Sequence, residues 1–316
     1  MTTIINLQDI LSAVKDVDVV AVMEEAFVEY SNGNSVVPPV GELLFDKPKG
    51  DTHIKYGYIK GQQLYCIKIA SGFYDNPKLG LSSSQGMMLL FSQKTGEPVA
   101  ILLDEGKLTD LRTAAAGALA AKYFAPQKIK AIGIIGTGIQ ARLQLQYLQK
   151  QTNCKEVWIW GRNTQNVKKF KDEIDSSYAV HIASSAAELA KTCNLIVSTT
   201  SSNKPLLFAD DIMPGTHITA MGSDTSGKQE LESKLLERAD ILIADSISQS
   251  KSRGEVFRAI EDRAIKPEKV QELGNVIQKK SLQRTSEEQI SIVDLTGVAV
   301  QDIMIATAVY KNHFRP

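Results

Sequence analysis

The chain has 316 residues, of which 43% are hydrophobic and 23% are charged. This length is sufficient for two domains of ordinary size, each with its own core. The 36 lysines and arginines balance the 36 aspartates and glutamates, so no overall electrostatic field attracts nucleic acid or an anionic membrane surface. We therefore expect a small-molecule partner.

The sequence predicts a cytoplasmic protein without a bound metal. The opening residues, MTTIINLQDILSAVKD, contain two aspartates and no basic start, which is not the pattern of a signal peptide. No window approaches eighteen uncharged apolar residues, as a membrane span would require. Cys66, Cys154 and Cys193 are widely spaced and the chain has four histidines, so we expect neither a disulfide framework nor a metal cluster.

The first part of the chain predicts helices followed by a sheet. Residues 8–30 place apolar side chains three and four positions apart, which indicates one or two amphipathic helices. From about Gly41 to Pro98, short β-branched runs alternate with turn residues and predict a mostly antiparallel sheet. Residues 108–125 are rich in alanine and predict a helix.

After Pro126 the pattern becomes strand and helix in alternation, with continuously apolar strands. This texture is typical of a parallel, doubly wound α/β sheet, the Rossmann architecture. We therefore predict a dinucleotide-binding domain over residues 125–298. The small-residue helix near 296–311 is expected to return to the first domain, which then comprises residues 1–124 and 299–316.

The stretch IGIIGTGIQA contains the spacing Gly136-x-Gly138-x-x-Ala141 directly after an apolar strand and before a helix. Gly136 suits the tight turn, and Gly138 lets the backbone approach a pyrophosphate. The pyrophosphate would lie on the amides at the start of the helix, near Gln140. The context makes this glycine pattern a prediction of dinucleotide binding rather than of a simple turn.

The strand EVWIW ends in Gly161-Arg162-Asn163, where an NAD-specific site would place an acid for the ribose hydroxyls. Arg162 would instead contact a 2′-phosphate, so the sequence favours NADP(H), with NAD(H) as a possible second cofactor. The alternative interpretation is a solvent-exposed arginine in a loop.

Two basic residues of the first domain are candidates for substrate binding. Arg112 is the first arginine of the chain and opens the alanine-rich helix, which suits a bidentate clamp for a carboxylate or phosphate. Lys68 lies in the apolar run YCIKIA, where desolvation would lower its pKa. A structural ion pair for Arg112 and a snorkelling side chain for Lys68 are the alternatives.

Taken together, these motifs resemble the ornithine cyclodeaminase/mu-crystallin family. The resemblance extends over nearly the whole chain and rests on six stretches in the family's order: IKIASGFYDNPKLGL, TGEPVAIL, LTDLRTAAAGALAAKYFAP, GIIGTGIQA, GSDTSGKQEL and TGVAVQD. It implies a Rossmann domain beside a substrate-binding domain that also forms a homodimer interface.

The resemblance also implies roles for individual residues. Lys68 matches the family's active-site lysine, and Arg112 matches the arginine that binds the substrate carboxylate and a cofactor phosphate. Asp224 matches the acid that handles water or protons, and Lys228 matches a residue on the substrate side. The positions that match cofactor contacts are Ser83, Ile139, Gln140, Thr199, Thr200, Ser201 and the segment Leu295 to Gly297.

Two departures from the family pattern select a branch of it. The arginine of a P-x-R segment is missing from VVPPVGELLF. Lys55 stands thirteen residues before Lys68, where cyclodeaminases have a glutamate for the distal amine of ornithine, and a lysine would repel that ammonium. His53 and Lys55 could supply the missing carboxylate contact, or could be exposed strand charges.

The resemblance is therefore greatest to the imino-acid reductases of this family, which reduce Δ1-pyrroline-2-carboxylate to L-proline or Δ1-piperideine-2-carboxylate to L-pipecolate. Hydride would pass from C4 of NADPH to the C=N carbon, with Asp224, or alternatively Lys68, protonating the ring nitrogen. The alternatives are ornithine cyclodeaminase with recycled NAD, an alanine or opine-type dehydrogenase, and a non-enzymatic NADPH-binding protein of the mu-crystallin type.

Overall fold

The computed structural model describes residues 2–73 and 75–314, and the chain divides into two compact units. Unit 1 extends to Arg112 and resumes at Val298, and unit 2 comprises Thr113–Gly297. The sequence pattern placed the first boundary after residue 124. The contacts divide the chain within α3 (Lys107–Phe124), the alanine-rich helix itself.

Unit 1 is built on a seven-stranded sheet with the order β1-β7-β6-β5-β4-β2, to which β3 adds by pairing with β4. The pairs are antiparallel, as the turn-rich sequence predicts, except that β1 and β7 are parallel. The strands are β1 (Thr3–Ile5), β2 (Ser35–Val36), β3 (Gly41–Asp46), β4 (Lys49–Ile59), β5 (Leu64–Phe73), β6 (Ser84–Ser92) and β7 (Pro98–Leu102).

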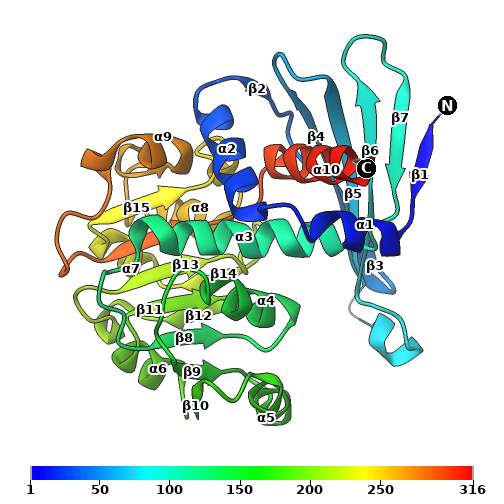
Figure 1. The fold of residues 1–316 in the computed structure, drawn as a ribbon. Helices are drawn as coiled ribbons and strands as arrows, with labels where there is room; N and C mark the ends of the chain where they lie inside the picture. The colour runs from blue at the N-terminus through cyan, green and yellow to red at the C-terminus, as the bar shows by residue number, and fades with distance from the viewer. Residues whose placement is uncertain (1, 74, 315–316) are drawn as a thin grey trace. The chain divides into compact units, whose positions relative to one another are not determined.

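The helices of unit 1 cover one face of this sheet. Residues 8–30 form two helices, α1 (Leu7–Val14) and α2 (Val19–Ser31), and the side chain of Asp18 caps α2 by accepting from the amide of Ala21. The C-terminal helix α10 (Ala299–His313) packs on α1, α2, β4, β5 and β6 (Figure 1). A short 3₁₀ helix, η1 (Asn76–Leu79), follows β5.

The two faces of this sheet differ in what they carry. On the face toward α10, β5 presents Leu64, Cys66 and Lys68, all buried. The opposite face carries three cross-strand rows of apolar and aromatic side chains. These outer-face rows are Tyr58–Tyr65–Phe91, Tyr56–Ile67–Leu89 and Ile54–Ile69–Met87.

Unit 2 contains an eight-stranded sheet in which every pair is parallel, with the order β10-β9-β8-β11-β13-β17-β15-β16. The predicted doubly wound α/β fold is therefore confirmed. The strands are β8 (Ile132–Ile135), β9 (Glu156–Trp160), β10 (Ala179–Ile182), β11 (Leu195–Ser198), β13 (His217–Ala220), β15 (Ile241–Ala244), β16 (Gln271–Glu272) and β17 (Ser291–Asp294). A separate parallel pair comprises β12 (Asn203–Leu207) and β14 (Gln229–Leu231).

Helices pack on both faces of the parallel sheet (Figure 1). One core joins the strands to α6 (Ala186–Thr192), α7 (Ser233–Arg238) and α8 (Gly254–Glu261), and α4 (Ile139–Leu148) covers the other face. The remaining helices are α5 (Thr164–Glu173), α9 (Leu273–Gln278) and the 3₁₀ turns η2 (Ala209–Asp211), η3 (Gln249–Lys251), η4 (Pro267–Lys269) and η5 (Lys280–Leu282). Within residues 2–73 and 75–314, no helix combines the length and apolarity needed to cross a membrane.

Candidate active site

A pocket of about 360 Å³ lies at the carboxyl edge of the parallel sheet in unit 2. In this sheet β9 lies on one side of β8, and β11 lies on the other side. The carboxyl end of β8 is therefore the topological switch point, where doubly wound proteins bind ligands. Its walls come from the segments that follow β8, β9 and β11. They include Gly136 to Gly138, Gly161 to Asn163 and Thr199 to Ser202.

The glycine turn has the local geometry that the sequence motif requires. Gly136 has φ of 118°, and a Cβ there would come within 2.4 Å of Thr199 Oγ1. A Cβ on Gly138 would meet no atom within 4 Å. Gly138 is the N-cap of α4 and no side chain caps that helix, so its first amides face a space that accepts an anion. These residues fit the pyrophosphate of a dinucleotide.

The turn itself is held from outside the pocket by Arg142. Its guanidinium donates to the carbonyl oxygens of Thr137 and Gly138, at 2.6 and 3.1 Å, and forms an ion pair with Glu173. The glycine turn is therefore fixed before any ligand arrives.

Arg162 and Asn163 both line the pocket, after β9. The Asn163 side chain caps α5 by accepting from the amides of Gln165 and Asn166, whereas Arg162 is exposed. The structure thus places one cation, and no acid among the lining residues, on this wall of the pocket.

Not every predicted cofactor residue lines this pocket. Ile139 and Gln140 begin α4 beyond it, and Gln140 accepts a bond from Gln144. Gly297 is buried after β17, where its amide donates to Asp245 and its carbonyl accepts from Gln249. Ser83 belongs to unit 1, where its carbonyl accepts from Phe73.

A buried cluster of charges lies on the helix-covered face of the unit 1 sheet. Lys68 Nζ on β5 is 3.1 Å from both carboxylate oxygens of Asp302 on α10. Arg112 donates from Nε to Asp302 Oδ1 at 3.2 Å and from Nη1 to Gln301 at 3.3 Å. Lys68, Arg112 and Asp302 expose 2%, 6% and 1% of their surface.

This cluster gathers the charges of three basic side chains around Asp302. Burial lowers the pKa of Lys68, and the charge of Asp302 opposes that shift. Burial alone would raise the pKa of Asp302, but the charges of Lys68, Arg112 and Lys55 bring it below its ordinary value. Burial also raises the pKa of nearby Asp104. Lys68, Arg112 and Lys55 therefore gather around Asp302, with Asp104 nearby, and such a group of cations is suited to binding a carboxylate.

Lys55 and His53 are neighbours of this cluster on β4. Lys55 is buried and stands directly opposite Lys68 in the β4–β5 register. His53 is bonded to Glu42 at 2.7 Å and lies 3.7 Å from Asp51. The structure thus brings Lys55 to the cluster and engages His53 with acids on its own sheet.

The remaining sequence candidates lie in the loop of residues 221–228 between β13 and β14. Lys228 Nζ donates to Asp224 Oδ1 at 2.6 Å, and Arg253 donates to the carbonyl of Asp224. Asp224 is therefore an acid with a cation in contact, held in a loop that follows a strand of the parallel sheet.

Sequence reasoning did not single out two buried acids, Asp302 and Glu230. Asp302 pairs with both predicted cations of unit 1, and its sequence signal is an aspartate inside the apolar helical run AVQDIMIA. Glu230 is fully buried on β14 and accepts hydrogen bonds from both Thr200 and Gly222. Within the described residues, no group of three or more His, Cys, Asp or Glu side chains has an arrangement suited to a metal.

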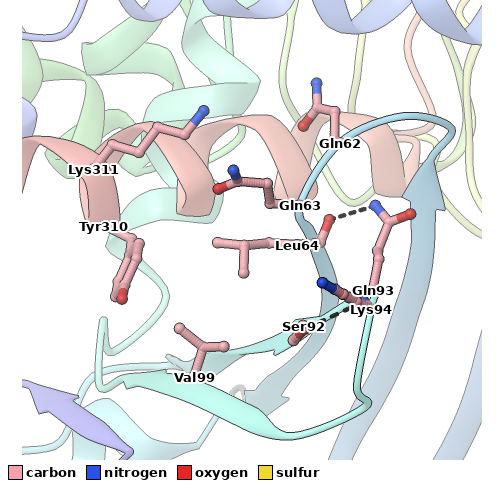
Figure 2. A pocket seen from close by; sticks show the side chains of 9 residues that line it. All are labelled: Gln62, Gln63, Leu64, Ser92, Gln93, Lys94, Val99, Tyr310 and Lys311. Atoms are coloured by element: carbon pink, nitrogen blue, oxygen red, sulfur yellow. Dashed lines mark hydrogen bonds between the residues drawn. The ribbon is translucent and has the colours of Figure 1, made fainter.

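A larger pocket, of about 620 Å³, lies elsewhere in unit 1 and contains none of the predicted site residues. Figure 2 shows its wall of glutamines with Tyr310 and Lys311 of α10. The Gln93 side chain there is already bonded to the carbonyl of Leu64 at 2.8 Å. We assign it no role in the chemistry, because the titratable groups described above lie in other places.

A doubly wound parallel sheet with a glycine turn at its switch point defines a dinucleotide-binding fold of the Rossmann type. The chain belongs to the ornithine cyclodeaminase/mu-crystallin family, whose model matches residues 2–315.

Among relatives, an uncharacterized cyclodeaminase of Sinorhizobium fredii is 40% identical over 301 residues, 94% of this chain and 91% of that protein. The iminosuccinate reductase of Paracoccus denitrificans is 36% identical over 260 residues, 81% of this chain and 80% of that protein. The first relative carries no assigned substrate in its name, so identity alone does not select one.

Two solved structures share the whole fold. An archaeal alanine dehydrogenase dimer with bound NAD has a TM-score of 0.89 at 34% identity, and the match covers 98% of this chain and 95% of that one. The Δ1-pyrroline-2-carboxylate reductase of Thermococcus litoralis, in complex with NADH and L-proline, has a TM-score of 0.90 at 26% identity and covers 98% and 97%.

Proposed function

We propose that this protein is an NAD(P)H-dependent reductase of cyclic imino acids, acting on Δ1-pyrroline-2-carboxylate or Δ1-piperideine-2-carboxylate. The observation that carries the proposal is the buried cluster of Lys55, Lys68 and Arg112 around Asp302. Such a cluster suits a small substrate with one carboxylate and no distal ammonium. The reductase from Thermococcus litoralis, with its bound L-proline, supports this substrate class.

In this proposal Arg112 and Lys68 hold the substrate carboxylate, because both are buried basic side chains that meet at Asp302. Asp224 or Lys68 donates the proton that makes the imine nitrogen an iminium, the form that accepts hydride readily. The reduced nicotinamide, when bound, supplies the hydride. The glycine turn and Thr199 to Ser201, which line the pocket, would hold the dinucleotide.

We further propose that the cofactor is NADP(H) in preference to NAD(H). The exposed Arg162 stands where a 2′-phosphate would lie, and the lining residues after β9 include no acid for ribose hydroxyls. The solved structures of the alanine dehydrogenase and the pyrroline-2-carboxylate reductase contain NAD and NADH, so the proposed preference rests on Arg162 in this chain.

An open-chain imine formed from a 2-oxo acid and ammonia is a second candidate substrate. The higher identity to alanine dehydrogenase and iminosuccinate reductase favours it, and Lys55 could contact a second carboxylate. The lyase alternative is disfavoured, because Lys55 directly opposite Lys68 would repel the distal ammonium of ornithine.

Oxidation of NADPH, followed at 340 nm, separates these candidates. We expect consumption with the two cyclic imines, and less with pyruvate or oxaloacetate plus ammonia. Consumption with the oxo acids alone would select the open-chain class and refute the cyclic one. Ammonia release from ornithine without net NADPH change would indicate the lyase, and cofactor binding without any turnover would indicate a binding protein.

We also propose a homodimer formed through the outer-face rows of the unit 1 sheet. Tyr56, Tyr58 and Met87 on this face expose 38%, 38% and 36% of their surface, and an apolar face of this extent usually marks a protein interface. Placing an arginine at the centre, Ile67→Arg, should yield monomers by light scattering. The control is Leu79→Arg in η1, 74% exposed and outside the sheet. Dimers in both variants would refute this interface.

A further inference from the structure

Glu230 is a buried carboxylate to which the proposed reaction assigns no task. It lies on the short strand β14, is 0% exposed, and its oxygens accept four hydrogen bonds. Oε1 accepts from the amide and the hydroxyl of Thr200, at 2.6 and 2.7 Å. Oε2 accepts from the hydroxyl of Ser198 at 2.9 Å and from the amide of Gly222 at 2.8 Å. Burial raises the pKa of Glu230, and the four donors oppose that shift by stabilising the ionised carboxylate.

These donors belong to the ends of two neighbouring strands. Ser198 ends β11 and Thr200 follows it, in the segment that lines the dinucleotide pocket. Gly222 follows β13 and begins the loop that carries Asp224. Glu230 thus closes the loop of residues 222–230 on itself and bonds it to the wall of the cofactor pocket.

The fit between these segments leaves no room for adjustment at Gly222. A Cβ on Gly222 would come within 2.0 Å of the Thr200 carbonyl oxygen and 2.5 Å of the Glu230 side chain. The glycine is therefore required because two backbone segments and one carboxylate meet at this point.

The backbone of Glu230 is held in turn by Glu255, in the first turn of α8. The Glu255 oxygens accept from the amides of Glu230 and Leu231, at 2.7 and 3.1 Å. Burial, together with the nearby charge of Glu230, raises the pKa of Glu255 to about 8. Near neutral pH, Glu255 therefore holds its proton for much of the time, which limits the repulsion between the two acids.

We propose that Glu230 is a positioning residue, which sets the Asp224 loop and the cofactor-lining segment Thr199 to Ser201 in one fixed arrangement. The inference rests on the proposed function, because it gives these two segments their tasks. Glu230 acts through the orientation of these two segments and not through contact with a ligand, since its side chain is fully buried. An apolar residue at this position would leave both segments without their common acceptor.

The test compares Glu230→Gln with Glu232→Gln. The first change keeps the shape of the side chain but puts an amide group, itself a donor, against the donors of one loop. The second makes the same chemical change two residues along the chain, where Glu232 accepts one bond from the amide of Ala209. The measurements are amide exchange in the two loops, the Kd for NADPH, and kcat and KM for the imine.

For Glu230→Gln we expect faster amide exchange in at least one of the loops 199–202 and 221–228, and a weaker Kd for NADPH. We also expect kcat to fall roughly ten- to a hundredfold, since a displacement of about 1 Å can cost about a hundredfold. The KM for the imine should change less, because the carboxylate cluster belongs to residues of unit 1. Glu232→Gln should show none of these changes.

Loss of stability in Glu230→Gln with unchanged loop exchange, Kd and kcat would overturn the inference, as would equal effects in both variants. If Glu230→Gln does not fold, Thr200→Val replaces it: this variant removes the hydroxyl donor and keeps the amide, and should loosen the same loops. Loop exchange is measured without ligand, so it judges Glu230 even if the wild-type protein reduces no imine and the proposed function fails.

Discussion

We predict that replacement of Asp302, in the buried charge cluster of unit 1, strongly lowers the free energy of unfolding. In Asp302→Asn, Lys68 and Arg112 lose the carboxylate that lies 3.1 and 3.2 Å from them. At these separations the Coulomb attraction of each pair is about 5 kcal/mol at an effective dielectric constant near 20. Lys68 can release its proton and so avoid part of this loss. Removal of one partner from a buried pair usually costs about 3–5 kcal/mol, and we expect this drop in unfolding free energy.

The assay must report on unit 1. Both tryptophans of the chain, Trp158 and Trp160, lie on β9 in unit 2, so their fluorescence follows unit 2 alone. Urea unfolding should therefore be followed by circular dichroism and by amide exchange in α10. We expect the exchange transition of α10 to shift and the tryptophan transition to shift less.

A double-mutant cycle identifies the origin of the effect. If the unpaired Lys68 charge causes the loss, Lys68→Met should restore at least about 1.5 kcal/mol in the Asp302→Asn background, within the range of measured couplings. The charge of Asp302 raises the pKa of Lys68, so any alkaline limb of imine reduction that reflects Lys68 should move to lower pH in Asp302→Asn. Stability within about 1 kcal/mol of wild type, with additive single effects, would refute this account.

Three further predictions concern unit 2. Arg162→Asp should weaken NADPH binding about tenfold or more, as loss of a charge-assisted hydrogen bond does, and equal weakening of NADH would disprove the phosphate contact. Gly136→Ala should destabilise the ligand-free protein by about 1–3 kcal/mol, because φ is positive and Thr199 is too close. Gly138→Ala should leave the stability unchanged but weaken NADPH binding. A destabilised Gly138→Ala beside a stable Gly136→Ala would contradict the turn geometry. Burial lowers the pKa of His217 to about 3, so as pH falls the imidazole is protonated in the unfolded state before it is protonated in the folded state. Between pH 7.5 and 5, the wild type should therefore lose about 2 kcal/mol more stability than His217→Gln. Parallel pH profiles of the two proteins would refute a neutral buried imidazole.

The sequence predicts much of the fold because its signals are local. Continuous apolar strands separated by amphipathic helices indicate a parallel sheet within windows of about ten residues, and the eight-stranded sheet confirms them. The pair β12 and β14 was not predicted, because strands of five and three residues carry too little periodicity. The contacts divide the chain within α3, a point that a helix pattern does not mark, since the pattern does not change where the packing partners change.

The candidate site was less predictable, since its decisive contacts join distant positions. Lys68 and Arg112 are conspicuous in the sequence, but the acid that joins them lies 234 and 190 residues further on. Glu230 is equally hidden, because a glutamate beside a leucine on a short strand gives no sign that four donors surround it. Only the three-dimensional arrangement separates such acids from the many solvated ones.

The direct pairing of Lys55 with Lys68 across β4 and β5 has a consequence for the free protein. Two buried cations at adjacent positions repel each other, and this repulsion lowers the stability of the folded protein. A carboxylate that binds beside Lys55 and Lys68 reduces this repulsion, and its affinity is higher for that reason. Simple monocarboxylates such as acetate or L-proline should therefore raise the melting temperature of unit 1 in the absence of a nucleotide, because a ligand that binds only the folded state stabilises it.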